Sequence, residues 1–233
     1  MAKVVSAQMD GEFYTEDATK TFLSPSSVDL FITNPPFYGI HVDEYGSANK
    51  QMHNTETISE FIDNLVLATL EMQKALKPDG HILLILPNKP FIFEYIVRIS
   101  GSSTLNFGQM LVWDLMKIES SIENYSALVL DLHDGGHIDP GNELLRFPLG
   151  DISDLGQFTD IGFPWDSLPM QVYAQLIEKF SKPGNVVADI LGGTGSICLA
   201  AIDTNRKFIY NDVSDEQTAI AVKRYELYKK KAD

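Results

Sequence analysis

The sequence predicts an α/β protein with a mostly parallel sheet and helices on both of its faces. Short apolar or β-branched runs alternate with amphipathic segments along most of the 233 residues. The run "HILLILP" is apolar almost throughout, which is typical of a central parallel strand that is buried on both faces. This length suits one α/β domain with a large core.

Each expected element follows from its local pattern. Strands are predicted where short runs of apolar residues end at turn signals, over residues 12–17, 28–33, 81–87, 108–115, 125–132, 186–190 and 207–212. We expect the strand over 125–132 to add an antiparallel edge to the sheet. Helices are predicted where apolar residues recur at helical spacing, over 55–76, 91–100, 167–181, 197–205 and 214–231. Thr55 or Thr57 is expected to cap the first of these helices and Ser214 the last.

The composition restricts the functions that the chain can have. With 32 acidic and 18 basic residues its net charge is -14, so it repels nucleic acid on average. Any nucleic-acid function then needs a local basic patch, a partner or weak binding. The single cysteine, Cys198, is expected to be buried and favours a reducing compartment. No apolar run reaches the roughly 20 residues of a membrane span, and no signal-peptide pattern is seen, which favours the cytoplasm.

A glycine loop follows the strand over 186–190. Asp189 ends that strand, and three glycines (Gly192, Gly193 and Gly195) precede the next helix, where a ligand can approach the backbone closely. Asp212 ends the next strand about 20 residues later, where a carboxylate can bind the hydroxyls of a ribose. An acidic residue before the glycines suits an ammonium or sulfonium better than a pyrophosphate. This favours S-adenosylmethionine over NAD or ATP, and a tight structural turn remains the alternative.

A second unusual motif, "NPPF", ends the strand over 28–33. The side-chain oxygen of Asn34 and the carbonyl of Pro35 can accept hydrogen bonds from the two N–H groups of a nucleobase amine, which prepares its nitrogen for methylation. Pro36 helps to keep this geometry rigid, and Phe37 offers a ring on which a base can stack. A strand-ending turn with a core phenylalanine is the alternative interpretation.

Together these motifs resemble those of the DNA amino-methyltransferases, which methylate adenine at N6 or cytosine at N4. "NPPF" is similar to their [DNS]PP[YFW] catalytic motif, and "VVADILGGTGSICLAAIDTNRKFIYNDVSDEQTAIAVKRYE" is similar to their cofactor segment. "FYTEDA" resembles the strand whose acidic residue contacts the cofactor adenine. The resemblance covers nearly the whole chain and implies a set of cofactor-binding residues: Asp17, Asn34, Asp189, Leu191, Gly193, Gly195, Ser196 and Asp212.

The order of the motifs indicates a subtype. The catalytic motif precedes the cofactor motif, as in the permuted β-type enzymes, so the resemblance implies a Rossmann-like methyltransferase fold with circularly permuted motifs and a seven-stranded type of sheet. Asn34 at the first motif position favours adenine-N6 methylation of a flipped base. Cytosine-N4 methylation and a non-catalytic, cofactor-binding subunit are the alternatives. We expect restriction-modification as the biological setting.

The remaining expectations concern the domain and its partners. Residues 1–233 are expected to form one catalytic domain, in which a short loop-rich insertion at 133–163 replaces the target-recognition region. Because this insertion is acidic and has a single arginine, Arg146, a homodimer or a separate DNA-recognition partner is considered. His133 and His137 are expected in solvated loop, and no metal site is predicted. The family's Pro-Phe after the strand aspartate is replaced here by Ile190-Leu191.

Overall fold

The computed structural model describes residues 4–8, 10–36, 38, 55–87, 89–115, 125–134 and 170–232. Phe37 lies outside these residues, as do Arg146, His137 and residues 135–163 of the predicted insertion. Within the described part of the chain, no helix is long and apolar enough to span a membrane.

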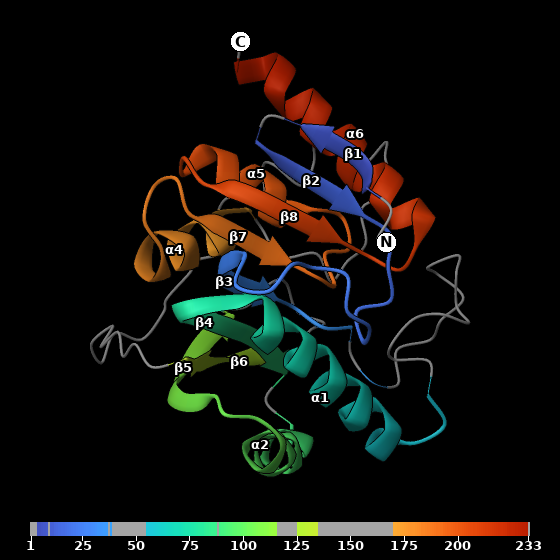
Figure 1. Ribbon diagram of the computed structural model, residues 1–233, viewed down its shortest axis with the longest axis vertical. Helices are drawn as coiled ribbons and strands as arrows, with labels where there is room; N and C mark the ends of the chain where they lie inside the picture. Colours follow the sequence, from blue (N-terminus) through green and yellow to red (C-terminus); the bar gives the residue numbers. More distant parts are fainter. Residues whose placement is uncertain are drawn as a thin grey trace.

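An eight-stranded sheet organises the described residues (Figure 1). Its spatial order is β1-β2-β8-β7-β3-β4-β6-β5. The bounds of the strands are β1 Val4–Gln8, β2 Gly11–Tyr14, β3 Val28–Thr33, β4 Leu76–Pro87, β5 Asn106–Leu115, β6 Tyr125–His133, β7 Val186–Asp189 and β8 Lys207–Asn211. β2, β8, β7, β3 and β4 are mutually parallel, whereas β1 and β6 run against their neighbours. The Rossmann-like methyltransferase fold is thereby confirmed.

Two details of the sheet differ from the sequence prediction. The strand over 125–132 is antiparallel as expected, but it lies inside the sheet between β4 and β5, and β5 is the edge strand. The prediction of an edge position was wrong. A connection joins β5 and β6 in the sequence, and the sequence does not show which of these two strands pairs with the core. The second difference is β1, an eighth strand that pairs antiparallel with β2 and was not predicted.

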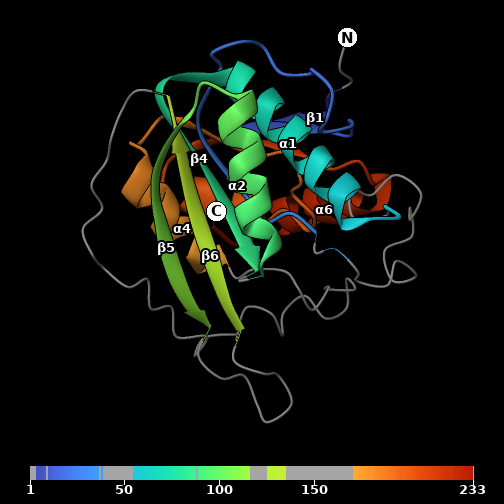
Figure 2. The same ribbon diagram turned by 90° about the horizontal axis from the view of Figure 1, so that it is seen from below.

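The helices cover the two faces of the sheet. α1 (Ile58–Ala75) and α2 (Phe91–Ser102) lie on one face, and α4 (Met170–Phe180), α5 (Ser196–Asp203) and α6 (Asp215–Ala232) lie on the other. Figure 2 shows α2 and α4 on opposite sides of the strands. Successive residues of β3 point to opposite faces, so Leu30 and Ile32 pack with one group of helices and Phe31 with the other. A strand that is buried on both faces is what its continuous apolar run predicts.

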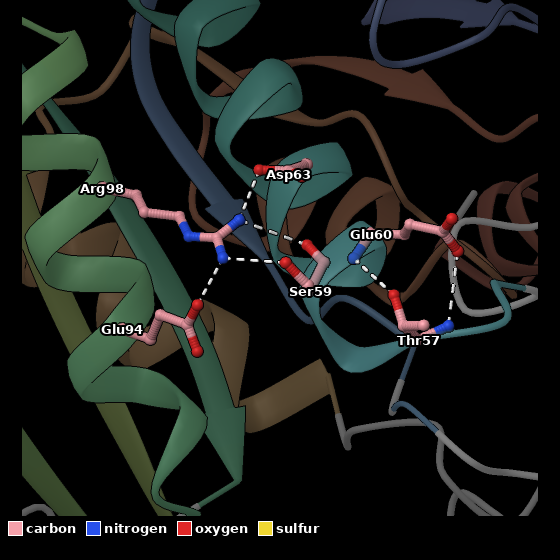
Figure 3. Close-up of polar contacts among 6 residues, drawn as sticks. All are labelled: Thr57, Ser59, Glu60, Asp63, Glu94 and Arg98. Atoms are coloured by element: carbon pink, nitrogen blue, oxygen red, sulfur yellow. Dashed lines mark hydrogen bonds and ion pairs between the residues drawn. The ribbon is translucent and has the colours of Figure 1, made fainter.

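Polar contacts fix the start of α1 and join it to α2 (Figure 3). The Thr57 hydroxyl accepts a hydrogen bond from the Glu60 N–H at 3.2 Å, and the Glu60 carboxylate accepts one from the Thr57 N–H at 3.3 Å, which forms a capping box. Arg98 on α2 contacts Asp63 of α1 at 2.5 Å and also Glu94. Of the two expected caps, Thr57 is therefore the one used.

A polar cluster lies in the core between β4 and β6. His81 and Asp131 are paired at 2.7 Å between Nδ1 and Oδ1, and both are fully buried. His133 is also buried, at the end of β6, with its ring centroid 5.6 Å from that of His81. The expectation that His133 lies in solvated loop was wrong, because the glycines that follow it begin only after the strand has ended.

Candidate active site

The site is built where neighbouring parallel strands end. β3 pairs with β7 and β7 pairs with β8, and all three run in the same direction, so their carboxyl ends meet at one edge of the sheet. The residues that follow them are Asn34 after β3, Asp189 at the end of β7, and Asp212 after β8. Motifs that are some 150 residues apart in the chain thus become neighbours (Figure 1).

Asp189 is a buried carboxylate at the centre of this edge. It is 1% exposed, accepts a hydrogen bond from the Leu191 N–H at 3.0 Å, and lies 3.5 Å from the Tyr173 hydroxyl of α4. Burial raises the pKa of Asp189 to about 7, and the negative charge of Asp212 acts in the same direction. A buried carboxyl with this pKa favours a cation beside it, since a cation would stabilise its charged form.

The glycine loop between β7 and α5 has the conformation that its sequence requires. Gly193 and Gly195 have φ values of 48° and 80°, in the left-handed region that favours glycine. A Cβ at Gly192 would lie 2.5 Å from the Tyr210 ring, and one at Gly195 would lie 2.7 Å from the Ala221 Cβ. No atom lies within 4 Å of a Cβ built at Gly193, so this residue faces open space.

Asp212 connects the loop to the end of β8. Its carboxylate oxygens accept hydrogen bonds from the N–H groups of Gly193 and Ser214, both at 2.9 Å. Ser214 in turn accepts a bond at 3.3 Å from the Gln217 N–H and caps α6 as expected. Asp212 as a whole residue is 7% exposed. Because each carboxylate oxygen can accept a further bond, ribose hydroxyls remain compatible with this arrangement.

Asp17 and Ser196 are two further predicted cofactor residues. Asp17 follows β2, the strand beside β8, and accepts hydrogen bonds from the Thr19 N–H at 3.0 Å and hydroxyl at 2.7 Å. Burial raises the pKa of Asp17, but the bonds from Thr19 and Lys20 outweigh this effect and lower it. Ser196 is the buried first residue of α5. Leu191 is half-buried, and Ile190 is 1% exposed within the core.

The diproline segment follows β3 directly. Asn34 and Pro36 are half-buried and Pro35 is buried. Tyr38 is 37% exposed, and its ring packs on Phe61 of α1 at 5.9 Å between centroids. Its hydroxyl is 3.4 Å from the Glu56 carbonyl, to which it donates. The ring of Tyr38 therefore rests against α1.

Three residues of the site could not be identified by motif reasoning. Asn211 is fully buried and joins three strand ends, since its amide donates to the carbonyls of Glu16 and Ile190 and its oxygen accepts from the Glu16 N–H. Tyr210 donates to the Gly193 carbonyl at 2.6 Å. Arg224 of α6 is 3% exposed and donates to the Thr194 carbonyl at 2.6 Å. A polar residue at the end of an apolar strand could have marked Tyr210 and Asn211, whereas Arg224 stands beside Lys223 in a basic run and carries no such signal.

The residues present fit a nucleoside ligand that carries a positive charge. A buried carboxylate suits a sulfonium or ammonium, a second carboxylate at the neighbouring strand end suits ribose hydroxyls, and the open side of Gly193 allows close approach to the backbone. Among the described residues, no group of three or more metal-ligating side chains could hold a metal ion.

The comparisons with known proteins agree with the class of fold, that of the Rossmann-like methyltransferases. A family model described as DNA methylase matches residues 166–223, which span the helix before β7, the glycine loop and the first half of α6. This match confirms the resemblance to the DNA amino-methyltransferases in the cofactor segment. No curated protein sequence matches the chain.

Individual solved structures share nearly the whole fold. PvuII DNA methyltransferase (cytosine-N4-specific) is 18% identical with a TM-score of 0.72, over 95% of this chain and 90% of that one. The putative DNA modification methylase TTHA0409 from Thermus thermophilus, complexed with S-adenosyl-L-methionine, is 18% identical with a TM-score of 0.63 over 93% of both chains. The M1.HpyAVI–SAM complex is 16% identical with a TM-score of 0.64, over 92% of this chain and 98% of that one. At these identities the likeness establishes the fold.

Proposed function

We propose that the protein is an S-adenosylmethionine-dependent DNA amino-methyltransferase that methylates the N6 amine of adenine. The observation that carries the proposal is the pairing of β3 with β7, which brings Asn34-Pro35-Pro36 beside Asp189 and the glycine loop. The family match over residues 166–223 and the S-adenosyl-L-methionine complexes of two similar structures support the cofactor.

The residues have separate roles in this proposal. Asp189, Leu191, Gly193, Gly195 and Ser196 shape the methionine side of the cofactor site, with Asp189 facing the cation. Asp212 binds the ribose hydroxyls and Asp17 the adenine ring of the cofactor, each from the end of its own strand. Asn34 lies between the cofactor site and the base and serves both.

The chain prepares the target amine for methyl transfer. The Asn34 side-chain oxygen and the Pro35 carbonyl accept hydrogen bonds from the two N–H groups of the amine. The lone pair of the amine nitrogen then points toward the methyl donor. Pro36 keeps these acceptors in place, and Phe37 stacks on the flipped base. S-adenosylmethionine supplies an electrophilic methyl group on a sulfonium. The methylated amine is briefly a strong acid, and its proton leaves to solvent without a dedicated base.

The same proposal covers the organisation of the protein and its partners. Residues 1–233 form one catalytic domain, with the residues after β6, up to residue 163, replacing a larger target-recognition region. DNA is the substrate, in a cytoplasmic restriction-modification setting, and a homodimer or a separate recognition partner supplies the contacts that an acidic chain lacks.

A methyl-transfer assay on unmethylated DNA, followed by methylome sequencing of the product, tests this function. N6-methyladenine in a defined sequence context is the expected result. Methylation of cytosine at N4 would contradict the adenine assignment while supporting the chemistry, an outcome to be taken seriously because PvuII DNA methyltransferase is cytosine-N4-specific. Cofactor binding with no transfer to duplex or single strands would support the non-catalytic subunit instead.

Replacement of Asn34 tests the assignment of the catalytic motif. Asn34→Ala removes one of the two acceptors for the amine, and we expect methyl transfer to fall by at least about 100-fold. The dissociation constant for S-adenosylmethionine, measured by calorimetry, should change by less than about threefold, because most cofactor contacts come from β7 and β8. Loss of cofactor binding together with activity would contradict the division of roles.

A further inference from the structure

Arg224 is a buried arginine behind the glycine loop. It lies on α6, is 3% exposed, and remains a cation at neutral pH although burial lowers its pKa to about 10. A single guanidinium nitrogen, Nη1, donates to the Thr194 carbonyl at 2.6 Å, to the Thr194 hydroxyl at 2.9 Å and to the Ser196 hydroxyl at 3.4 Å. Burying an arginine in this position costs desolvation free energy, so the contribution of its contacts to the protein needs an explanation.

The peptide group between Thr194 and Gly195 is held at both of its ends. Its carbonyl accepts from Arg224, and its N–H donates to the Gly192 carbonyl at 2.9 Å. Because the peptide is planar, these two contacts fix its orientation. The preceding carbonyl, that of Gly193, is held at 2.6 Å by the Tyr210 hydroxyl. Hydrogen bonds from Arg224 and Tyr210 therefore hold the loop against the rest of the protein, while Gly193 still faces open space.

α6 presents two matched features to this loop. Ala221 and Arg224 are three residues apart and so lie on the same face of the helix. The small side chain of Ala221 lets α6 approach Gly195, where even an added Cβ would lie within 2.7 Å. Arg224 then reaches past it to the carbonyl of Thr194. The close approach of α6 to Gly195 and the contact of Arg224 with Thr194 are thus parts of the same packing arrangement.

From these contacts we infer that Arg224, assisted by Tyr210, is a positioning residue that preorganises the glycine loop for the cofactor without touching it. The inference rests on the proposed function, since it assigns a role within the same cofactor site. A loop already held in its binding conformation loses less conformational entropy when the ligand binds. Removing Arg224 should therefore weaken cofactor binding more than it changes the chemical step.

The chain offers a matched control for this role. Arg206 is also buried, at 8% exposure, and also donates to backbone carbonyls, those of Ser181 at 2.8 Å and of Thr204. It precedes β8, at the sheet edge opposite to the glycine loop. Arg206→Met and Arg224→Met thus each remove a guanidinium that donates to backbone carbonyls, but of the two only Arg224 contacts the candidate site.

The experiment compares both variants with the wild-type protein by calorimetry with S-adenosylmethionine and with S-adenosylhomocysteine. We expect Arg224→Met to raise both dissociation constants by about tenfold or more, and Arg206→Met by less than about twofold. With saturating cofactor, methyl transfer by Arg224→Met should stay within about threefold of wild type. Amide hydrogen exchange at residues 192–197 should be faster in Arg224→Met than in Arg206→Met, with or without ligand.

Each contrary outcome has a distinct meaning. If wild type binds the cofactor and the two variants weaken binding equally, Arg224 is merely structural and the inference is overturned. If wild type binds neither compound, the proposed function fails and the inference with it. Should Arg224→Met not fold, Tyr210→Phe takes its place, because it keeps the ring against Gly192 and removes only the hydroxyl that holds Gly193. Unchanged affinity in Tyr210→Phe would then overturn the inference.

Discussion

Single residues at the strand ends combine structural and functional demands that oppose one another. Asp189 is fully buried, and its pKa of about 7 means that the ligand-free protein holds a carboxyl in surroundings that disfavour its charge. Core packing alone would favour an apolar residue here. The charge of Asp189 becomes favourable when a cationic ligand lies beside it. Asp189 therefore lowers the stability of the ligand-free protein and strengthens ligand binding.

The pH dependence of stability follows from the direction of this shift. The folded-state pKa of Asp189 lies above its ordinary value of 3.8, so the folded protein binds the proton more tightly than the unfolded chain. The contribution of Asp189 to the free energy of unfolding therefore falls as the pH rises from about 4 to about 7. Asp189→Asn should remove this dependence and stabilise the ligand-free protein at pH 8 by up to about 4 kcal/mol, since each pKa unit corresponds to about 1.4 kcal/mol, measured by urea denaturation.

Cofactor binding tests Asp189 in the opposite direction, because here the charged carboxylate is favourable. Because the charged carboxylate favours the sulfonium, wild-type affinity for S-adenosylmethionine should rise with pH through about 7, and binding should release a proton from Asp189. Asp189→Asn should bind more weakly and without this pH dependence. An asparagine variant that binds as tightly as wild type would contradict the role of Asp189 in facing the cation.

Secondary-structure elements were predicted best where one local pattern decides the outcome. The continuous apolar run of β3, the period of α1 and the capping residue Ser214 each identify their element in isolation. The position of β6 between β4 and β5 depends on which strand pairs with the core, and sequence pattern does not encode this. The burial of His133 depends likewise on the partner strand.

The candidate site divides in the same way. Its glycines and acidic residues are recognisable because their chemistry is unusual at strand ends. Asn211, Tyr210 and Arg224 act through contacts with backbone groups, and such contacts exist only after the strands and helices have been assembled. A buried polar residue needs a partner, but the sequence alone does not identify which carbonyl it will be.

The start of α1 allows a local prediction with a neighbouring control. Thr57 closes a capping box with Glu60, whereas the Thr55 hydroxyl only donates to the Thr57 carbonyl at 3.1 Å (Figure 3 shows the box). Thr57→Ala should lower the free energy of unfolding by about 1 kcal/mol, because an N–H at the helix start loses its acceptor. Thr55→Ala should change it by less than about 0.5 kcal/mol. Equal losses in thermal or urea unfolding would contradict this assignment of the cap.

At the scale of the whole molecule, charge is the main obstacle to the proposed substrate. The net charge is -14, and many of the described cations are already paired with acids. These pairs are Lys20 with Asp17, Lys74 with Glu71, Lys77 with Asp29, Arg98 with Asp63 and Glu94, and Lys229 with Asp10. A cation that must also neutralise a carboxylate contributes less to phosphate binding.

Lys89 is the exposed lysine best placed for DNA among the described residues. It follows the carboxyl end of β4, the strand that pairs with β3, and so lies on the edge of the sheet that carries the diproline segment. Lys182 is exposed too, but it precedes β7 and lies at the opposite edge. The two lysines thus differ in location relative to the site while contributing the same charge.

Salt dependence of DNA binding distinguishes a local contact from a general effect of charge. A lysine that neutralises one phosphate adds about 0.9 to the slope of log K against log salt. Lys89→Ala should therefore lower the slope for a duplex by about one, with a weaker affinity at low salt. Lys182→Ala removes the same charge at the far edge and should leave the slope unchanged within about 0.3. Equal slopes for the two variants would mean that DNA does not approach the carboxyl end of β4. Since Asn34 lies at that same edge, such a result would also contradict the path by which a flipped base is proposed to enter.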